Sequence, residues 1–135
     1  MAIKDSVTQT ALQSPLGRVR GRGSARGGTH QWWMQRVTSI ALLPLTIWFV
    51  FSAVGLAGVG YAETRAWIAA PVNAVLLLAM IGLTFHHMAN GLQVVVEDYT
   101  RGEFARMAIV LAIKAVSLLM ALACALAVLR IALGS

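Results

Sequence analysis

Three long apolar stretches, two of them without any formal charge, constrain this chain more than any other feature of its sequence. Residues 37–62 and residues 66–96 contain no Asp, Glu, Lys or Arg, and a third apolar stretch follows a charged loop. About 20 apolar residues are enough for a helix to cross the hydrocarbon core of a bilayer. The pattern predicts an all-α integral membrane protein with three transmembrane helices, at about 34–58, 68–96 and 105–131. These long unbroken apolar stretches exclude a β-barrel, whose short strands alternate polar and apolar residues.

The composition points to the same class of protein. Hydrophobic residues make up 59% of the 135 residues and charged residues only 12%. Soluble domains average about 45–50% apolar and about 25% charged residues. A soluble chain of this length could not bury so much apolar surface. The excess must face lipid or the helices of partner subunits, so we expect this chain to pack with a partner anchor into a larger helix bundle.

Positive charge is distributed unevenly along the chain. Six of the eleven Lys and Arg residues lie within the first 36 positions, and two more lie in the loop 97–106. Basic segments next to membrane spans stay on the cytoplasmic side. We therefore expect residues 1–30 to form a basic, Gly/Arg-rich cytoplasmic arm and residues 31–135 to form the transmembrane domain, with the C-terminus periplasmic. The alternative for the arm is a nucleic-acid-binding tail, but it continues directly into a membrane span, so no nucleic acid is expected as a partner.

The second predicted helix carries polar residues in the motif FHHMANGLQVVVEDY, at positions 85–99. The helical period puts His87, Gly91 and Asp98 on one face and His86 on the neighbouring face. An imidazole inside a membrane span needs a partner, and a haem iron is one. Gly91 would leave room for a flat porphyrin, and a second axial ligand would come from another subunit. Two alternatives stay open: a histidine hydrogen-bonded between helices, and His86 as the ligand.

Asp98 and Tyr99 end this helix at the predicted cytoplasmic interface. A tyrosine hydroxyl can donate a hydrogen bond to a quinone carbonyl, and a neighbouring carboxylate can hold a proton. Quinone reduction requires both functions. The alternative is that both are ordinary interfacial residues at a helix end.

Two basic residues near the first span are further candidates for ligand binding. Arg36 follows Trp32 and Trp33 at the start of the first helix, and His30 precedes it. Either side chain could pair with a haem propionate, since arginine binds carboxylates well. The alternative for Arg36 is a snorkelling side chain that marks the cytoplasmic end of the span.

Together these residues resemble a known family. HHMANGLQVVVEDY is similar to the second-helix motif of the small, D-type membrane anchor subunit of succinate dehydrogenase: His, then Gly four residues later, then Asp-Tyr at eleven and twelve. His87, Gly91, Asp98 and Tyr99 match these spacings. The segment GTHQWWMQRVTSIALLP also resembles the family's first-helix start, with its basic residue at Arg36. The resemblance extends over about residues 16–106.

The resemblance implies a complex with a flavoprotein, an iron–sulfur protein and a second, cytochrome b-type membrane anchor, located in a bacterial cytoplasmic (inner) membrane. Electrons would pass from succinate to ubiquinone, linking the tricarboxylic acid cycle to the respiratory chain. His87 would be one axial ligand of haem b, with Gly91 beside it, Arg36 and His30 would contact a propionate, and Tyr99 and Asp98 would bind the quinone. This subunit alone would have no catalytic turnover. An anchor of quinol:fumarate reductase, a structural membrane subunit without cofactor and a small transporter are the alternatives.

Overall fold

A computed structural model of the chain describes residues 26–134, and all its regular structure in this range is helical. The elements are α3 (Arg26–Gly55), α4 (Tyr61–Ala69), α5 (Pro71–Tyr99) and α6 (Glu103–Ala132). The chain divides into two units, Met1–Trp32 and Trp33–Ser135. The described part of the first unit is the beginning of α3, and the rest of the predicted arm lies outside the described residues.

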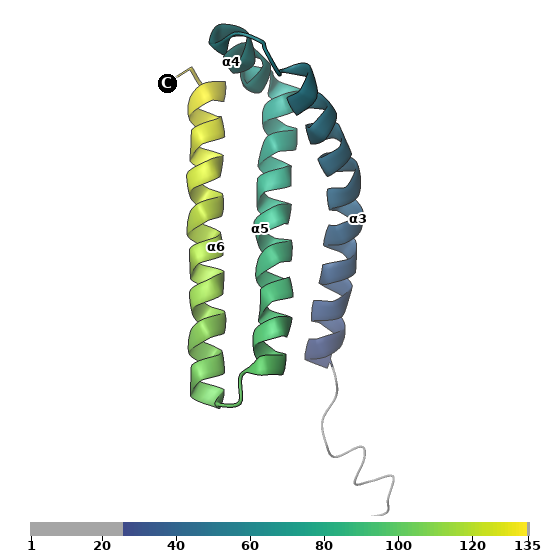
Figure 1. Cartoon of the computed structure of the whole chain (residues 1–135), viewed down its shortest axis with the longest axis vertical. Coiled ribbons are helices and arrows are strands. Elements are labelled where there is room, and N and C mark those ends of the chain that lie inside the picture. Colours follow the sequence, from purple (N-terminus) through teal and green to yellow (C-terminus); the bar gives the residue numbers. More distant parts are fainter. Residues whose placement is uncertain (1–25, 135) are drawn as a thin grey trace, which may run out of the picture. The chain divides into compact units, whose positions relative to one another are not determined.

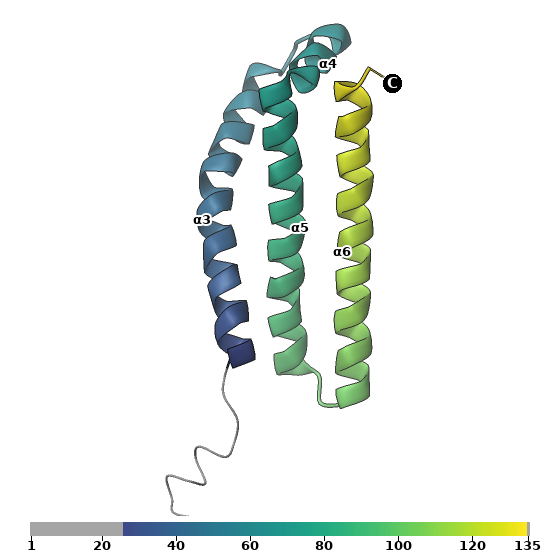
Figure 2. The same ribbon diagram turned by 180° about the vertical axis from the view of Figure 1, so that it is seen from behind.

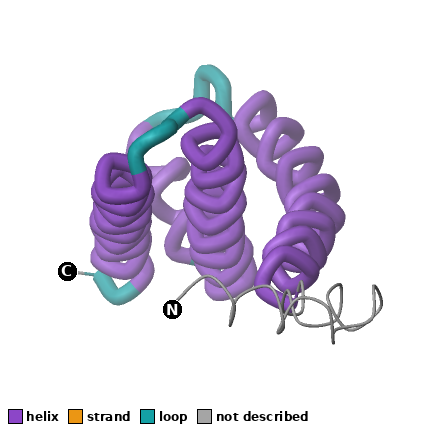
Figure 3. The backbone as a smooth tube through the Cα atoms, turned by 90° about the horizontal axis from the view of Figure 1, so that it is seen from below, coloured by secondary structure: helices purple, strands orange, loops and turns teal. Residues whose placement is uncertain are grey.

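The three long helices confirm the predicted membrane spans. Each of α3, α5 and α6 contains a segment long and apolar enough to cross a bilayer. α3 begins at Arg26, eight residues before the expected start at 34, and α6 exceeds its expected bounds by two residues at its start and one at its end. Within the second unit α5 lies between α3 and α6 in both side views and in the view along the helices (Figures 1, 2 and 3).

The connection between the first two spans differs from the prediction. We expected a loop and then a helix starting at 68, but the chain forms the separate short helix α4 before α5 begins at Pro71. The reason is the proline: Ala70 adopts the extended ψ of 128° that a residue before proline prefers, and Pro71 takes the first helical position, where its missing N–H costs nothing. Trp67 therefore belongs to α4, and the second span is shifted three residues toward the C-terminus at both ends.

Two contacts hold this corner together. The side-chain amide of Asn73 donates a hydrogen bond of 2.8 Å to the Trp67 carbonyl, which caps the end of α4 from the start of α5. Trp67 also stacks on Trp48 of α3 with ring centroids 5.7 Å apart. At the end of α3, Gly58 has a φ of 86°, a left-handed conformation that glycine adopts without steric cost.

Very little of the described chain is buried within it. The buried residues are two apolar ones, Ala74 and Ala89 on α5, and two polar ones, Thr38 on α3 and Ser117 on α6. All four are small, as expected where membrane helices approach closely. No large side chain among residues 29–134 is fully buried, and many large apolar side chains of the spans are exposed, among them Phe51, Val72 and Leu111.

Candidate functional site

His87 is held against α3 through both ring nitrogens. Its Nδ1 lies 2.9 Å from Thr38 Oγ1 and its Nε2 lies 3.3 Å from the side-chain nitrogen of Gln35. The imidazole is half-buried, and Thr38 is only 2% exposed. The predicted intramembrane histidine thus has polar partners from a neighbouring helix of its own chain.

The surrounding hydrogen bonds determine where the imidazole carries its proton. Thr38 Oγ1 lies 2.8 Å from the Met34 carbonyl and 3.1 Å from the Gln35 carbonyl, and a carbonyl can only accept. The hydroxyl proton therefore goes to a carbonyl, and Thr38 Oγ1 accepts Nδ1–H from His87. On the other side, the Gln35 amide nitrogen can only donate, so Nε2 accepts. These contacts favour the neutral tautomer protonated at Nδ1, with the lone pair on Nε2.

Gln35 also borders the space beside Gly91. A Cβ atom added at Gly91 would lie 3.4 Å from Gln35 Nε2, which is a tight contact. The carbonyl oxygen of the same amide, Gln35 Oε1, is buried and has no hydrogen-bond partner among the described residues. Exchanging the amide oxygen and nitrogen would instead bury an unpaired NH₂ group. The Gln35 amide therefore makes one weak hydrogen bond to His87 and leaves its other polar atom unsatisfied.

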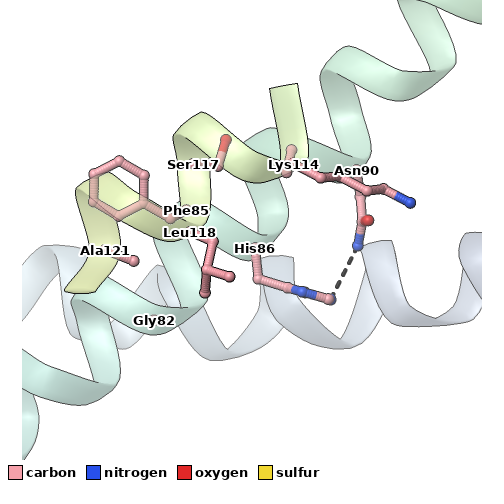
Figure 4. A pocket seen from close by; sticks show the side chains of 9 residues that line it. Gly82, Phe85, His86, Asn90, Lys114, Ser117, Leu118 and Ala121 are labelled. Atoms are coloured by element: carbon pink, nitrogen blue, oxygen red, sulfur yellow. Dashed lines mark hydrogen bonds between the residues drawn. The ribbon is translucent and has the colours of Figure 1, made fainter. Parts of the chain in front are cut away.

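His86 faces a different environment, a cleft of about 440 Å³ between α5 and α6. Figure 4 shows the His86 side chain extending away from the Phe85 ring and toward Asn90, whose side-chain nitrogen lies within hydrogen-bond distance of the imidazole, at 3.0 Å. Gly82 and the small residues Ala89, Ser117 and Ala121 open the cleft, and Lys114 also lines it. The two neighbouring histidines thus lie on different faces of α5, as the helical period predicted, one against α3 and one in this cleft.

The predicted quinone-binding residues lie far from His87 along the same helix. Tyr99 ends α5 and is 84% exposed, and Asp98 is exposed as well. Twelve residues of α-helix separate His87 from Tyr99, or about 18 Å. The structure therefore does not gather all predicted site residues in one place: it gives a site around His87 within the membrane span and a separate group at the helix end.

The predicted propionate-binding residues both belong to α3 and are exposed. Arg36 is rotated by roughly 130° about the helix axis from the direction in which Gln35 and Thr38 point. It therefore lies on the side of α3 away from His87, and a group that binds both residues would have to reach around this helix. His30 lies six residues before Arg36 on α3, in the first of the two units.

Thr38 and Gln35 are the residues that sequence analysis missed. Neither belongs to a recognisable motif, and Thr and Gln are ordinary residues at a helix start. The available signal was their spacing of three residues, which puts both on one face of the first helix. That spacing did not identify their partner, because finding the partner requires knowing which face of α3 packs on α5. Among the described residues, no three His, Cys, Asp or Glu side chains gather into a metal-binding cluster.

Comparison with known proteins gives a consistent family. Residues 10–128 match the family model described as succinate dehydrogenase/fumarate reductase transmembrane subunit. The succinate dehydrogenase hydrophobic membrane anchor subunit of Rickettsia bellii is 29% identical over 108 residues, which cover 80% of this chain and 86% of the relative. The subunit of the same name from Paracoccus denitrificans is 25% identical over 100 residues, covering 74% and 78%. No solved structure gives a significant match.

Proposed function

Because this chain belongs to the succinate dehydrogenase/fumarate reductase transmembrane subunit family, we propose that it is the membrane anchor of a succinate:quinone oxidoreductase. In this role it would bind one side of a haem b through His87 and contribute Tyr99 and Asp98 to a ubiquinone-reduction site. The names of the relatives favour oxidation of succinate over the reverse reaction of a quinol:fumarate reductase.

The protonation state of His87 carries the haem proposal. An axial histidine binds iron through a ring-nitrogen lone pair while the other nitrogen donates a hydrogen bond. The contacts of His87 favour this arrangement, with Nδ1 2.9 Å from Thr38 Oγ1 and Nε2 3.3 Å from the Gln35 amide nitrogen. Gln35 would not prevent iron binding. Its amide would lose only one weak hydrogen bond by turning away from Nε2, because its other polar atom, Oε1, has no partner among the described residues. The residues present therefore fit a haem at this position.

When bound, a b-type haem would accept and return single electrons. The other contributions come from the protein. His87 would fix the position of the group, and Gly91 would keep its surroundings open. The propionate contact expected for Arg36 would need a rotation of α3, because Arg36 lies on the side of this helix away from His87. A partner anchor subunit would supply a second iron ligand, because His86, the other histidine of α5, lies in the α5–α6 cleft.

The end of α5 supports the quinone proposal. Reduction of ubiquinone to ubiquinol takes two electrons and two protons. The exposed Tyr99 hydroxyl is free to donate a hydrogen bond to one quinone carbonyl, because no partner for it exists among the described residues. Asp98 next to it could deliver a proton from the aqueous side. Flavin and iron–sulfur centres on the partner subunits would supply the electrons.

The exposed spans support the proposed partners and location. A chain with four buried residues among those described cannot be complete as a bundle in itself. We infer that the apolar faces of α3, α5 and α6 pack on a second anchor subunit and on lipid. The basic arm and the loop 97–106 would face the cytoplasm, where the flavoprotein and the iron–sulfur subunit would bind.

The experiment that tests this proposal is a reduced-minus-oxidised optical spectrum of the purified complex. Wild type would be measured beside His87→Ala and His86→Ala. We expect a b-type signal in wild type and in His86→Ala, and a lost or shifted signal in His87→Ala. Loss only in His86→Ala would move the haem to the α5–α6 cleft. A wild-type complex without haem would leave a cofactor-free structural anchor.

A further inference from the structure

We propose that Thr38 is a positioning residue for the haem ligand: it holds His87 in the iron-binding tautomer and orientation. The inference rests on the proposed function, because it assumes that His87 binds haem. It concerns a residue of the first span that neither the motif of the second helix nor the family match identifies.

The local structure of α3 makes Thr38 a rigid acceptor. Its hydroxyl donates back to the carbonyl of Met34, four residues earlier, at 2.8 Å. This bond fixes the side-chain rotamer of a threonine in a helix. With the proton committed to the backbone, the lone pairs of Oγ1 point to α5, where they meet His87 Nδ1 at 2.9 Å. Thr38 is buried to 98%, so water cannot replace it.

The chain of hydrogen bonds gives Thr38 an electronic effect as well. His87 Nδ1–H donates to Thr38 Oγ1, whose own proton is bonded to the Met34 carbonyl. Consecutive hydrogen bonds of this kind polarise one another. They increase the negative charge on the imidazole and its basicity toward a metal. A more basic ligand stabilises ferric over ferrous iron, so the hydrogen bond should lower the haem midpoint potential.

Gln35 competes for the same nitrogen that the iron would take. Its amide lies 3.3 Å from Nε2, at the long end for a hydrogen bond, and its other polar atom is unsatisfied. Thr38 therefore makes the stronger contact with His87, and it is the one compatible with ligation. Ligation would replace the Gln35 contact and leave the Thr38 contact in place.

The test uses the complete complex carrying Thr38→Val, which removes the hydroxyl at nearly constant volume, and Thr38→Ser, which keeps it. Ser39→Ala is the matched control: Ser39 is exposed, and its hydroxyl donates to the Gln35 carbonyl at 2.8 Å. The measurements are the haem midpoint potential by redox titration, the g-values of the oxidised haem by electron paramagnetic resonance, and the rate of haem transfer to excess apomyoglobin.

We expect Thr38→Val to raise the midpoint potential, change the g-values and weaken haem binding by about 10- to 100-fold. Thr38→Ser and Ser39→Ala should behave like wild type. If Thr38→Val does not assemble, Thr38→Ala compared with Thr38→Ser isolates the same hydroxyl. Equal potentials and g-values with and without the hydroxyl would overturn the inference, as would equal shifts in Thr38→Ser. Absence of haem from the wild-type complex would instead refute the proposed function.

Discussion

At the scale of single residues, the sequence predicted which polar residues of α5 share a face but not the residues of α3 that contact them. His87, Gly91, Asp98 and Tyr99 were predicted from one motif, because their spacing on a helix follows from 3.6 residues per turn. Thr38 and Gln35 could not be predicted, since a contact between helices depends on their relative rotation. The different faces of His86 and His87 were predicted correctly, because both residues belong to one helix and its period fixes their relative direction. Their neighbours across the contacts lie on other helices, whose rotation the sequence does not give.

Gly91 should be needed for haem binding, because a larger side chain would fill the space beside it. We expect Gly91→Leu to lower the haem-to-flavin ratio of the purified complex severalfold, since even a Cβ atom there would come within 3.4 Å of Gln35 Nε2. Gly82→Leu is the matched control on the same helix, where a Cβ would meet nothing within 4 Å. An unchanged haem content in Gly91→Leu would mean that haem does not approach this face of α5.

Tyr99 should affect quinone reduction alone. Removing its hydroxyl in Tyr99→Phe deletes one hydrogen bond, which contributes about 0.5–1.5 kcal/mol. We expect kcat/KM for ubiquinone to fall roughly 2- to 13-fold. Succinate oxidation measured with a water-soluble acceptor and the haem spectrum should not change. Tyr61→Phe, at the start of α4 and 81% exposed, should have no effect on any of these rates. Equal activities of Tyr99→Phe and wild type would remove Tyr99 from the quinone site.

At the scale of elements, hydrophobicity predicted the spans well and their connection poorly. The three long helices follow from long apolar stretches, which predict membrane spans whatever the helices pack against. The helix α4 was missed because its first half contains a Glu and an Arg, while its second half overlaps the uncharged stretch that begins at residue 66. Pro71 was the available signal for the boundary, since proline favours the first position of a helix.

The packing of α5 on α6 should depend on small side chains. Ala89 is 7% exposed and lines the cleft between the two helices. We expect Ala89→Leu to destabilise the complex by about 1–3 kcal/mol through overpacking, visible as a lower midpoint in thermal unfolding of the detergent-solubilised complex. Ala79→Leu adds the same volume at an exposed position of α5 and should unfold like wild type. Equal midpoints for both variants would mean that α6 can shift without loss of stability.

At the scale of the whole molecule, the distribution of charge links topology to function. A three-residue connection that carries Arg101 joins the end of α5 at Tyr99 to the start of α6 at Glu103. At the other end of the helices, Arg65 lies on α4 and Arg130 lies near the end of α6. If α3, α5 and α6 all cross the membrane, the start of α3 and the end of α6 lie on opposite sides of it. Because the first 36 residues and the 97–106 loop together hold eight of eleven basic residues, this side should be cytoplasmic.

Reporter fusions test this orientation and, with it, the side on which quinone is reduced. Alkaline phosphatase, which is active only outside the cytoplasm, should be active when fused after Ser135 and inactive when the chain is cut at Gly102 and fused there. A cytoplasmic fluorescent reporter at the same two positions should give the reverse pattern. Phosphatase activity at Gly102 would invert the topology and put Tyr99 on the periplasmic side. Tyr99 would then be separated by the membrane from flavin and iron–sulfur subunits in the cytoplasm, and the proposed quinone site at the end of α5 would have to be abandoned while the haem ligand His87 would be unaffected.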